Sequence, residues 1–144
     1  MSQRQASYRT RAPRVSEHDE QSSFFTRARL QFRGRGDFYE RLLFSVPNGM
    51  WAGGSNPYAL VAKFKAEGMG AGVSDILYLQ PRGEYAYLAI EMKAADKRTS
   101  KGAVSDEQME FLEEVNAAGG MGEVCYGADE AMEIFERYMS MSAG

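Results

Sequence analysis

The alternation of apolar and polar residues near the middle of the chain predicts a β-hairpin. Residues 76–79 are a short apolar run of strand-prone residues, and 85–92 form a second run that returns alongside it. Between them, 81–83 has the Pro-Arg-Gly composition of a turn. Because side chains alternate across a strand, Glu91 and Lys93 are expected to share one face at the end of the second strand.

The periodicity on both sides of the hairpin predicts further helices and strands. Before the hairpin we expect a helix that begins at Ser16 and buries Phe24, Phe25, Ala28 and Leu30, then a strand over 41–46 and a helix from Pro57 to Gly68. After the hairpin we expect a helix that begins at Ser105 and buries Met109, Phe111, Leu112 and Val115. A strand over 122–126 and a helix over 129–139 complete the chain. Ser105 and Gln108 have the spacing of a capping box. The order predicts an α/β domain with a central mixed β-sheet flanked by helices.

Length and charge divide the chain into two parts. Residues 1–15 are expected to form a flexible basic arm, and 16–144 a single domain large enough for its own core. The net charge is −3, but residues 1–102 hold 16 Lys and Arg against 10 Asp and Glu, whereas 103–144 hold one Arg against 10 acids. The basic part could meet phosphate, or the charges could simply solvate helix faces.

The composition also indicates where the protein works. We expect no membrane span, because the chain has no apolar run of about 18 residues, and the polar, Arg-rich N-terminus does not resemble a secretory signal. The single cysteine, Cys125, has no internal disulfide partner and is expected to be an inert core thiol. We therefore expect a cytoplasmic location, in a bacterium or in the host of a phage.

Three residues around the hairpin are candidates for a functional site. Asp75 precedes the first strand and can meet Glu91 and Lys93 across the hairpin, depending on the register. Two carboxylates gathered at the end of a buried strand are costly without a ligand to share. Mg²⁺ prefers hard oxygen ligands and takes one or two carboxylates with water and phosphate. This pattern therefore favours a divalent metal site.

The spacing of Asp75, fifteen intervening residues and Glu91-Met92-Lys93 resembles the PD-(D/E)xK nucleases. The flanking segments 62–68, 72–75 and 105–108 resemble the VRR-NUC branch of that superfamily, as do Glu17-x-x-x-Gln21 and Pro47-Asn48-Gly49. The resemblance covers roughly residues 16 to 139. It departs at Ser74, where the family usually has Pro, but this position shapes the turn and binds no metal.

The resemblance implies a restriction-endonuclease-like fold and a Mg²⁺- or Mn²⁺-dependent DNA endonuclease, with branched DNA or a Holliday junction as the expected substrate. The metal would be held by Asp75, Glu91 and the carbonyl of Met92. Lys93 would lie beside the attacking water and the phosphate. The other implied site residues are Gln108, which would orient Lys93 or the water, and Glu17 in the first helix, with Glu20 as its rival because the helix register is open.

Basic residues on the sequence near these positions are candidates for DNA contacts. They are Lys63, Lys65, Lys97, Arg98 and Lys101. The resemblance also implies a homodimer, since small stand-alone VRR-NUC proteins look like phage-encoded, junction-cleaving dimers. The competing hypothesis is a non-catalytic nucleic-acid-binding module on the same fold. An enzyme acting on nucleotides is less favoured, because the chain has no Walker-type loop.

Overall fold

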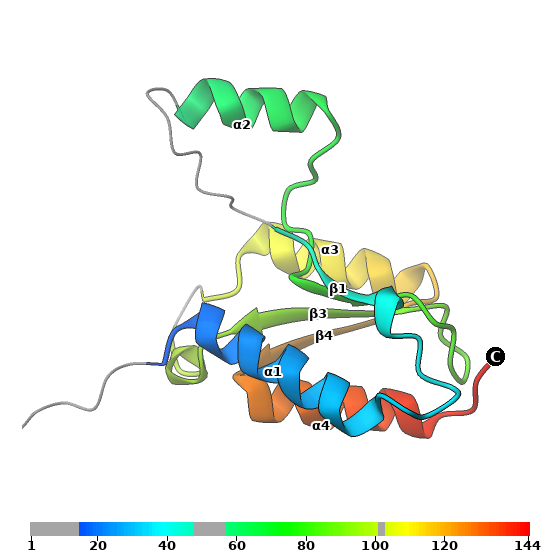
Figure 1. Ribbon diagram of the computed structural model, residues 1–144. Helices are drawn as coiled ribbons and strands as arrows, with labels where there is room; N and C mark the ends of the chain where they lie inside the picture. Colours follow the sequence, from blue (N-terminus) through cyan, green and yellow to red (C-terminus); the bar gives the residue numbers. More distant parts are fainter. Residues whose placement is uncertain (1–14, 48–56, 101–102) are drawn as a thin grey trace, which may run out of the picture.

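The computed structural model describes residues 15–47, 57–100 and 103–144. Within them, one four-stranded sheet has the order β1–β2–β3–β4 (Figure 1). Its strands are β1 (Leu43–Ser45), β2 (Ile76–Tyr78), β3 (Leu88–Lys93) and β4 (Met121–Tyr126). The first three strands are antiparallel and β4 runs parallel to β3, so the mixed sheet is as predicted.

The helices cover both faces of this sheet. On one face α1 (Glu17–Phe32) and α4 (Ala128–Ser140) pack against each other, and α3 (Asp106–Ala117) lies on the opposite face (Figure 1). Helix α2 (Pro57–Ala66) stands away from the sheet. Two short 3₁₀ helices are η1 (Glu40–Leu42) and η2 (Ala95–Lys97). None of the helices in these ranges is long and apolar enough to cross a membrane.

The predicted helix starts are confirmed by their capping contacts. The Ser16 side chain accepts a hydrogen bond from the Asp19 amide at 3.1 Å, which satisfies one of the free donors at the start of α1. At α3 the capping box is complete, because Ser105 and Gln108 each accept from the other's backbone amide. These local contacts fix where α1 and α3 begin beside the sheet.

The core explains why β3 is the central strand. Leu88, Ile90 and Met92 point toward α1 and α4, where they join a cluster of buried aromatic rings. The intervening Ala89 and Glu91 are buried as well, beneath the opposite layer. A strand covered on both faces normally carries apolar residues throughout. A carboxylate in the middle of such a strand is therefore an exception that needs a partner.

Two predictions of burial and one prediction of a strand boundary were wrong. Leu30 is 74% exposed, because α1 buries Phe24, Ala28 and Phe32 instead. Met109 is 41% exposed on α3, where Leu112 and Val115 are the buried residues. The last error concerns the second strand of the hairpin. It begins at Leu88 rather than Tyr85. The Ala86 amide donates to the Gly119 carbonyl in the turn before β4, and the Tyr87 carbonyl accepts from the amide of Met121, the first residue of β4.

The turn of the hairpin is fastened by a buried arginine. Arg82 is 1% exposed, and its Nε donates to the Gln80 side chain at 2.9 Å. Its two terminal nitrogens donate to the carbonyls of Met139 and Met141 and to the carbonyl and carboxylate of Asp37, all within 2.9 Å. Arg82 therefore ties the hairpin to the end of α4 and to the loop before η1, which fixes the strands that carry the candidate site.

Replacing Arg82 with methionine should lower the free energy of unfolding by about 3–5 kcal/mol, because the carbonyls of Asp37, Met139 and Met141 lose a buried donor and the Asp37 carboxylate keeps only its bonds from Arg35. Urea unfolding measures the change. Arg137→Met is the matched control, since Arg137 pairs with Glu123 on the surface and should contribute less than about 1 kcal/mol. Equal losses in both variants would show that the Arg82 network is not a special anchor.

Candidate metal centre

Glu91 is the most unusual residue of the structure. Its side chain is 1% exposed on the central strand, and its Oε1 atom accepts a hydrogen bond from Gln108 Nε2 at 2.8 Å. Lys93, two residues along on the same face, places its Nζ 3.4 Å from the same oxygen. The other oxygen, Oε2, is buried and has no hydrogen-bond partner among the described residues. One side of this carboxylate is thus held in place, and the other side lacks a partner.

Asp75 lies beside Glu91, as the resolved register now shows. Ile76 pairs with Ile90, so continuing the antiparallel register by one residue sets Asp75 opposite Glu91. Residues opposite one another project from the same face, about 5 Å apart at Cβ. The Asp75 Oδ2 atom accepts a hydrogen bond from the Met92 amide at 2.9 Å, which anchors the carboxylate on the next strand.

The electrostatics of the pair follow from this geometry. The pKa of Glu91 is raised to about 8, first by burial and then by the neighbouring charge of Asp75, whose effect is larger than the opposing effect of Lys93. A proton on Glu91 can be shared with Asp75 while no cation is present. The pair therefore needs either a proton or a cation at neutral pH.

The donor set fits a hard divalent ion. No group of three or more His, Cys, Asp or Glu side chains is placed to hold a metal in the part of the chain that the structure describes. Asp75 and Glu91 supply two carboxylates, and the Met92 carbonyl between Glu91 and Lys93 is a further candidate ligand. Mg²⁺ usually keeps several waters and needs only one or two carboxylates with a phosphate. The unpartnered, buried Oε2 of Glu91 is the atom that such an ion would satisfy.

Gln108 performs two tasks with one side chain. Its Oε1 accepts from the Ser105 amide at 2.9 Å and closes the capping box, while its Nε2 donates to Glu91. Gln108 therefore caps α3 and also contacts the candidate site. Through Gln108 the start of α3 fixes the orientation of the Glu91 carboxylate.

The first helix brings a different acid to this end of the sheet from the one we favoured. Glu17 is exposed in the first turn of α1. Glu20 is half-buried and accepts a hydrogen bond from the Ala128 amide at the start of α4. Its charge, together with those of Asp75 and Glu91, raises the pKa of Cys125 beyond the effect of burial. Glu20 thus lies at the start of α4, next to Gly127, and the choice between Glu17 and Glu20 as a site residue stays a prediction.

Sequence reasoning missed the glycine that makes this arrangement possible. Gly127 has a φ of 95°, which favours glycine, and its amide donates to the Lys93 carbonyl at 2.9 Å. A Cβ at this position would lie 3.0 Å from Glu20 Oε2. The available signal was a glycine directly between a strand pattern and a helix pattern. It brings the end of β3, the start of α4 and Glu20 together.

The buried thiol is chemically quiet, as predicted. Burial raises the pKa of Cys125 to about 12, so the thiolate is scarcely populated at neutral pH.

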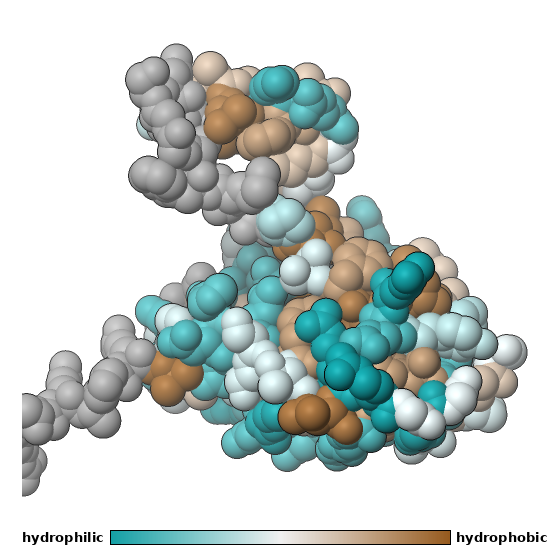
Figure 2. Space-filling view, in the orientation of Figure 1, coloured by the Kyte–Doolittle hydropathy of each residue, from teal (hydrophilic) through white to brown (hydrophobic). Residues whose placement is uncertain are grey.

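The candidate DNA contacts are spread over three places. Lys63 and Lys65 are exposed on α2, which stands apart from the rest of the described surface and carries both hydrophobic and hydrophilic side chains (Figure 2). Lys97 is exposed on η2, directly after β3. Arg98 follows it, but its guanidinium pairs with Glu130 and lies over the Tyr126 ring at 5.1 Å. Lys101 and residues 1–14 of the expected arm lie outside the described residues.

A comparison with protein families shows to which family the chain belongs. The family model of the VRR-NUC domain matches residues 54–129, more than half of the sequence. The chain belongs to the VRR-NUC family. VRR-NUC domains are nuclease domains, and nucleases of this type generally use a divalent metal.

A comparison with solved structures shows the same fold. A structure described as a VRR_NUC domain protein is similar to this VRR-NUC chain with a TM-score of 0.71 and 21% identity, over 92% of this chain and 94% of that one. The restriction-endonuclease-like fold is thereby confirmed. No protein of curated function matches the chain.

The charge of Glu91 makes the stability of the metal-free protein depend on pH. Its pKa of about 8 in the folded state lies above the ordinary 4.5, so folding favours the protonated form. The resulting stabilisation is complete below about pH 4.5 and is lost as the pH rises through 8, with a slope of at most about 1.4 kcal/mol per pH unit. Urea unfolding in EDTA between pH 5 and 9 should show this decline, and Glu91→Gln should remove it. If the free energy of unfolding declined equally with pH in the wild type and in Glu91→Gln, the decline could not be assigned to Glu91.

Proposed function

We propose that the protein is a Mg²⁺- or Mn²⁺-dependent endonuclease that cuts branched DNA. The observation that carries this proposal is the buried Glu91 carboxylate, whose Oε2 lacks a partner beside Asp75 while Lys93 and Gln108 hold Oε1. A bound divalent ion supplies Lewis-acid stabilisation of the reacting phosphate.

The side chains of the site have separate roles in this proposal. Asp75, Glu91 and the Met92 carbonyl would hold the ion, and the hydrogen bond from the Met92 amide fixes the Asp75 carboxylate. Gln108 prevents Glu91 from rotating its occupied oxygen away. Lys93, whose side chain is 13% exposed, presents an ammonium that donates to the scissile phosphate and favours the deprotonated form of the attacking water. Glu20 adds negative charge on the side of α1.

The competing function is a non-catalytic module that binds nucleic acid. Two neighbouring carboxylates, with the pKa of Glu91 raised, would then be a structural cost that does not increase the affinity for a polyanion. Binding alone would be served better by lysine or arginine at these positions. The geometry of the pair therefore favours hydrolysis.

A homodimer would suit a branched substrate. A symmetric four-way junction needs two cuts, and a C₂ dimer supplies two sites related by the same symmetry. We propose this assembly from the family resemblance, and we propose the cytoplasm as the compartment, since a single buried thiol suits a reducing environment.

The deciding experiment compares a four-way junction, a linear duplex of equal length and a supercoiled plasmid, each with Mg²⁺, Mn²⁺ or EDTA. Metal-dependent nicking with preference for the junction supports the full proposal. Metal-independent binding without cleavage would favour the non-catalytic module. Sedimentation at micromolar concentration tests the dimer, and a monomer that prefers the linear duplex would overturn the structural preference while leaving the nuclease chemistry intact.

A further inference from the structure

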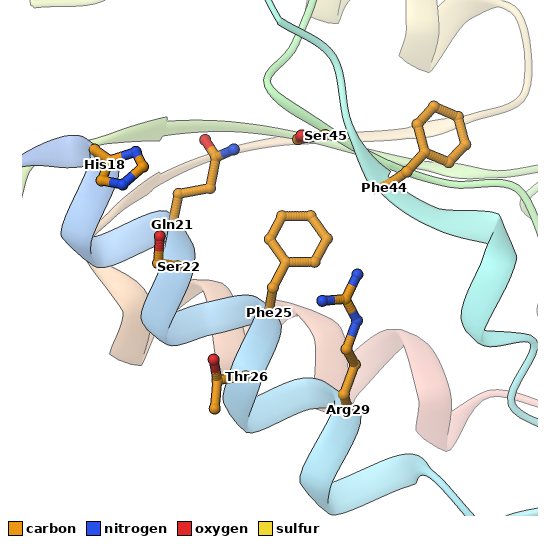
Figure 3. Close-up of a pocket in the computed structure, with 8 residues that line it drawn as sticks. All are labelled: His18, Gln21, Ser22, Phe25, Thr26, Arg29, Phe44 and Ser45. Carbon is orange, nitrogen blue, oxygen red and sulfur yellow. The ribbon is translucent and has the colours of Figure 1, made fainter.

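A groove lies between α1 and β1, one strand away from Asp75. Its volume is about 510 Å³, within the range of small-ligand sites. From α1 it is lined by residues spaced three or four apart, and Gln21, Phe25 and Arg29 project toward β1 (Figure 3). Within the part of the chain that the structure describes, none of the residues that line it is acidic: they are His18, Gln21, Ser22, Phe25, Thr26, Arg29, Phe44 and Ser45.

One end of the groove lies one strand away from the candidate metal centre. Ser45 lines the groove and pairs with Ile76, the residue after Asp75. The amide of Val46 donates to the Asp75 carbonyl at 2.8 Å. Neighbouring strands are about 4.8 Å apart. Ile76 faces the core beneath α1, whereas Asp75 and Glu91 lie on the face that α3 covers. A DNA strand whose phosphate sits at Asp75 and Glu91 would therefore reach the groove by passing round the edge of β1.

The edge of β1 offers hydrogen-bonding groups to this groove. The Leu42 carbonyl accepts from Leu79 and the Val46 amide donates to Asp75, so alternate residues of the strand bond inward to β2. By the antiparallel alternation, the backbone groups of Leu43 and Ser45 point to the opposite edge. The Leu43 amide there already donates to the Glu40 carbonyl, which leaves the Leu43 carbonyl and the amide and carbonyl of Ser45 as the outward groups. In the sheet formed by the described residues, β1 is an edge strand. These outward groups can pair with polar edges of a base.

The other wall supplies a surface for stacking. The Arg29 guanidinium lies over the Phe25 ring at 5.3 Å, and 43% of the Arg29 side chain is exposed. Its Nε also lies 3.6 Å from Glu40 Oε1, so the acid offsets part of its charge while the guanidinium plane stays available for stacking. Single-stranded nucleic acids are bound by aromatic and guanidinium planes on which bases stack, in a groove that carries positive charge. Duplex backbones require several cations, whereas this groove offers mainly hydroxyl, amide and ring groups. The lining thus suits bases whose edges are not already paired.

We propose that this groove binds unpaired nucleotides of the DNA strand that passes the Asp75–Glu91 pair. The inference rests on the proposed nuclease function and deepens it, because it gives the preference for branched DNA a physical source. A junction, gap or flap presents unpaired bases next to a cleavable phosphate, and a continuous duplex does not.

The test compares cleavage of a gapped duplex with cleavage of a continuous duplex of the same sequence. Ser22→Glu places a carboxylate in the groove, and Ser23→Glu places the same charge at the next, exposed position outside the lining. Ser22→Glu should lower the ratio of the two rates at least fivefold, the lower end of what one stacked base contributes. Ser23→Glu should leave the ratio within twofold. Arg29→Ala should behave like Ser22→Glu, with Arg27→Ala, which faces Asp129, as its control.

A binding measurement separates this inference from the nuclease proposal. In the Glu91→Gln background, 2-aminopurine in the gap should change its fluorescence on binding, and Ser22→Glu should weaken that binding at least fivefold relative to Ser23→Glu. This result would support the groove even if the wild type cut no DNA. Equal effects of Ser22→Glu and Ser23→Glu would overturn the inference. The inference would also be overturned if Ser22→Glu changed the sedimentation of the protein and left DNA binding unchanged. That result would indicate that the open edge of β1 pairs with a second copy of the chain.

Discussion

Replacing Glu91 with glutamine should abolish metal-dependent DNA cleavage while leaving the protein folded. The amide keeps an oxygen for Gln108 but removes the charge that completes the metal centre. Lewis-acid stabilisation by a bound ion is worth several kcal/mol, and about 4 kcal/mol corresponds to a thousandfold in rate. We therefore expect single-turnover cleavage to fall at least about a thousandfold. Asp75→Asn should have a similar effect, because an asparagine oxygen can still accept from Met92.

Thermal unfolding gives this prediction a second measurement. An ion that binds only the folded state raises its stability in proportion to occupancy, so Mg²⁺ should raise the melting temperature of the wild type and not of Glu91→Gln. In EDTA at pH 7 the variant should melt at the same temperature or higher, since glutamine resembles the protonated acid that burial favours. Glu84→Gln, which neutralises an exposed carboxylate, is the control and should match the wild type. Normal cleavage by Glu91→Gln at equal Mg²⁺ would show that the site lies elsewhere.

The elements that carry the site could be predicted from sequence because their signals are local. Ser16 and Ser105 mark helix starts through contacts with residues three positions ahead, and both caps are formed. The alternation from 85 to 93 likewise put Glu91 and Lys93 on one face, and both interact there. Such patterns depend on a few neighbouring residues, which the sequence displays directly.

The placement of the site depended on contacts that are distant in sequence. The position of Glu20 depends on the Ala128 amide, which is more than a hundred residues away and donates a hydrogen bond to the Glu20 carboxylate because α4 packs on α1. The sequence does not display this contact, so it left Glu17 and Glu20 as alternatives. The role of Arg82 was also hidden, because a Pro-Arg-Gly turn predicts only a bend. Its buried position requires the end of α4 and the loop at Asp37 to converge on it. The groove beside β1 is another case, because it exists only once α1 lies along the sheet edge.

Lys93 tests whether the site is built for catalysis rather than for holding an ion or a phosphate. Its ammonium lies 3.4 Å from Glu91 Oε1 and reaches the surface at the end of β3. If it stabilises charge that develops in the reaction, Lys93→Ala should lower the single-turnover rate by about 10²–10³, with DNA affinity changed only a few-fold. Lys93→Arg should not restore the rate, because a planar guanidinium cannot place its charge where a compact ammonium does.

Lys97→Ala is the matched comparison, since this exposed lysine lies four residues along on η2. A residue that only attracts the DNA backbone should weaken binding and reduce its salt dependence, while the rate for bound DNA stays near that of the wild type. Lys93→Ala should therefore lower mainly the rate for bound DNA, and Lys97→Ala should lower mainly the affinity for DNA. If Lys93→Ala also lost affinity and cut bound DNA at the normal rate, Lys93 would be a phosphate contact. The transition-state charge would then have to be stabilised by the ion that Asp75 and Glu91 would hold.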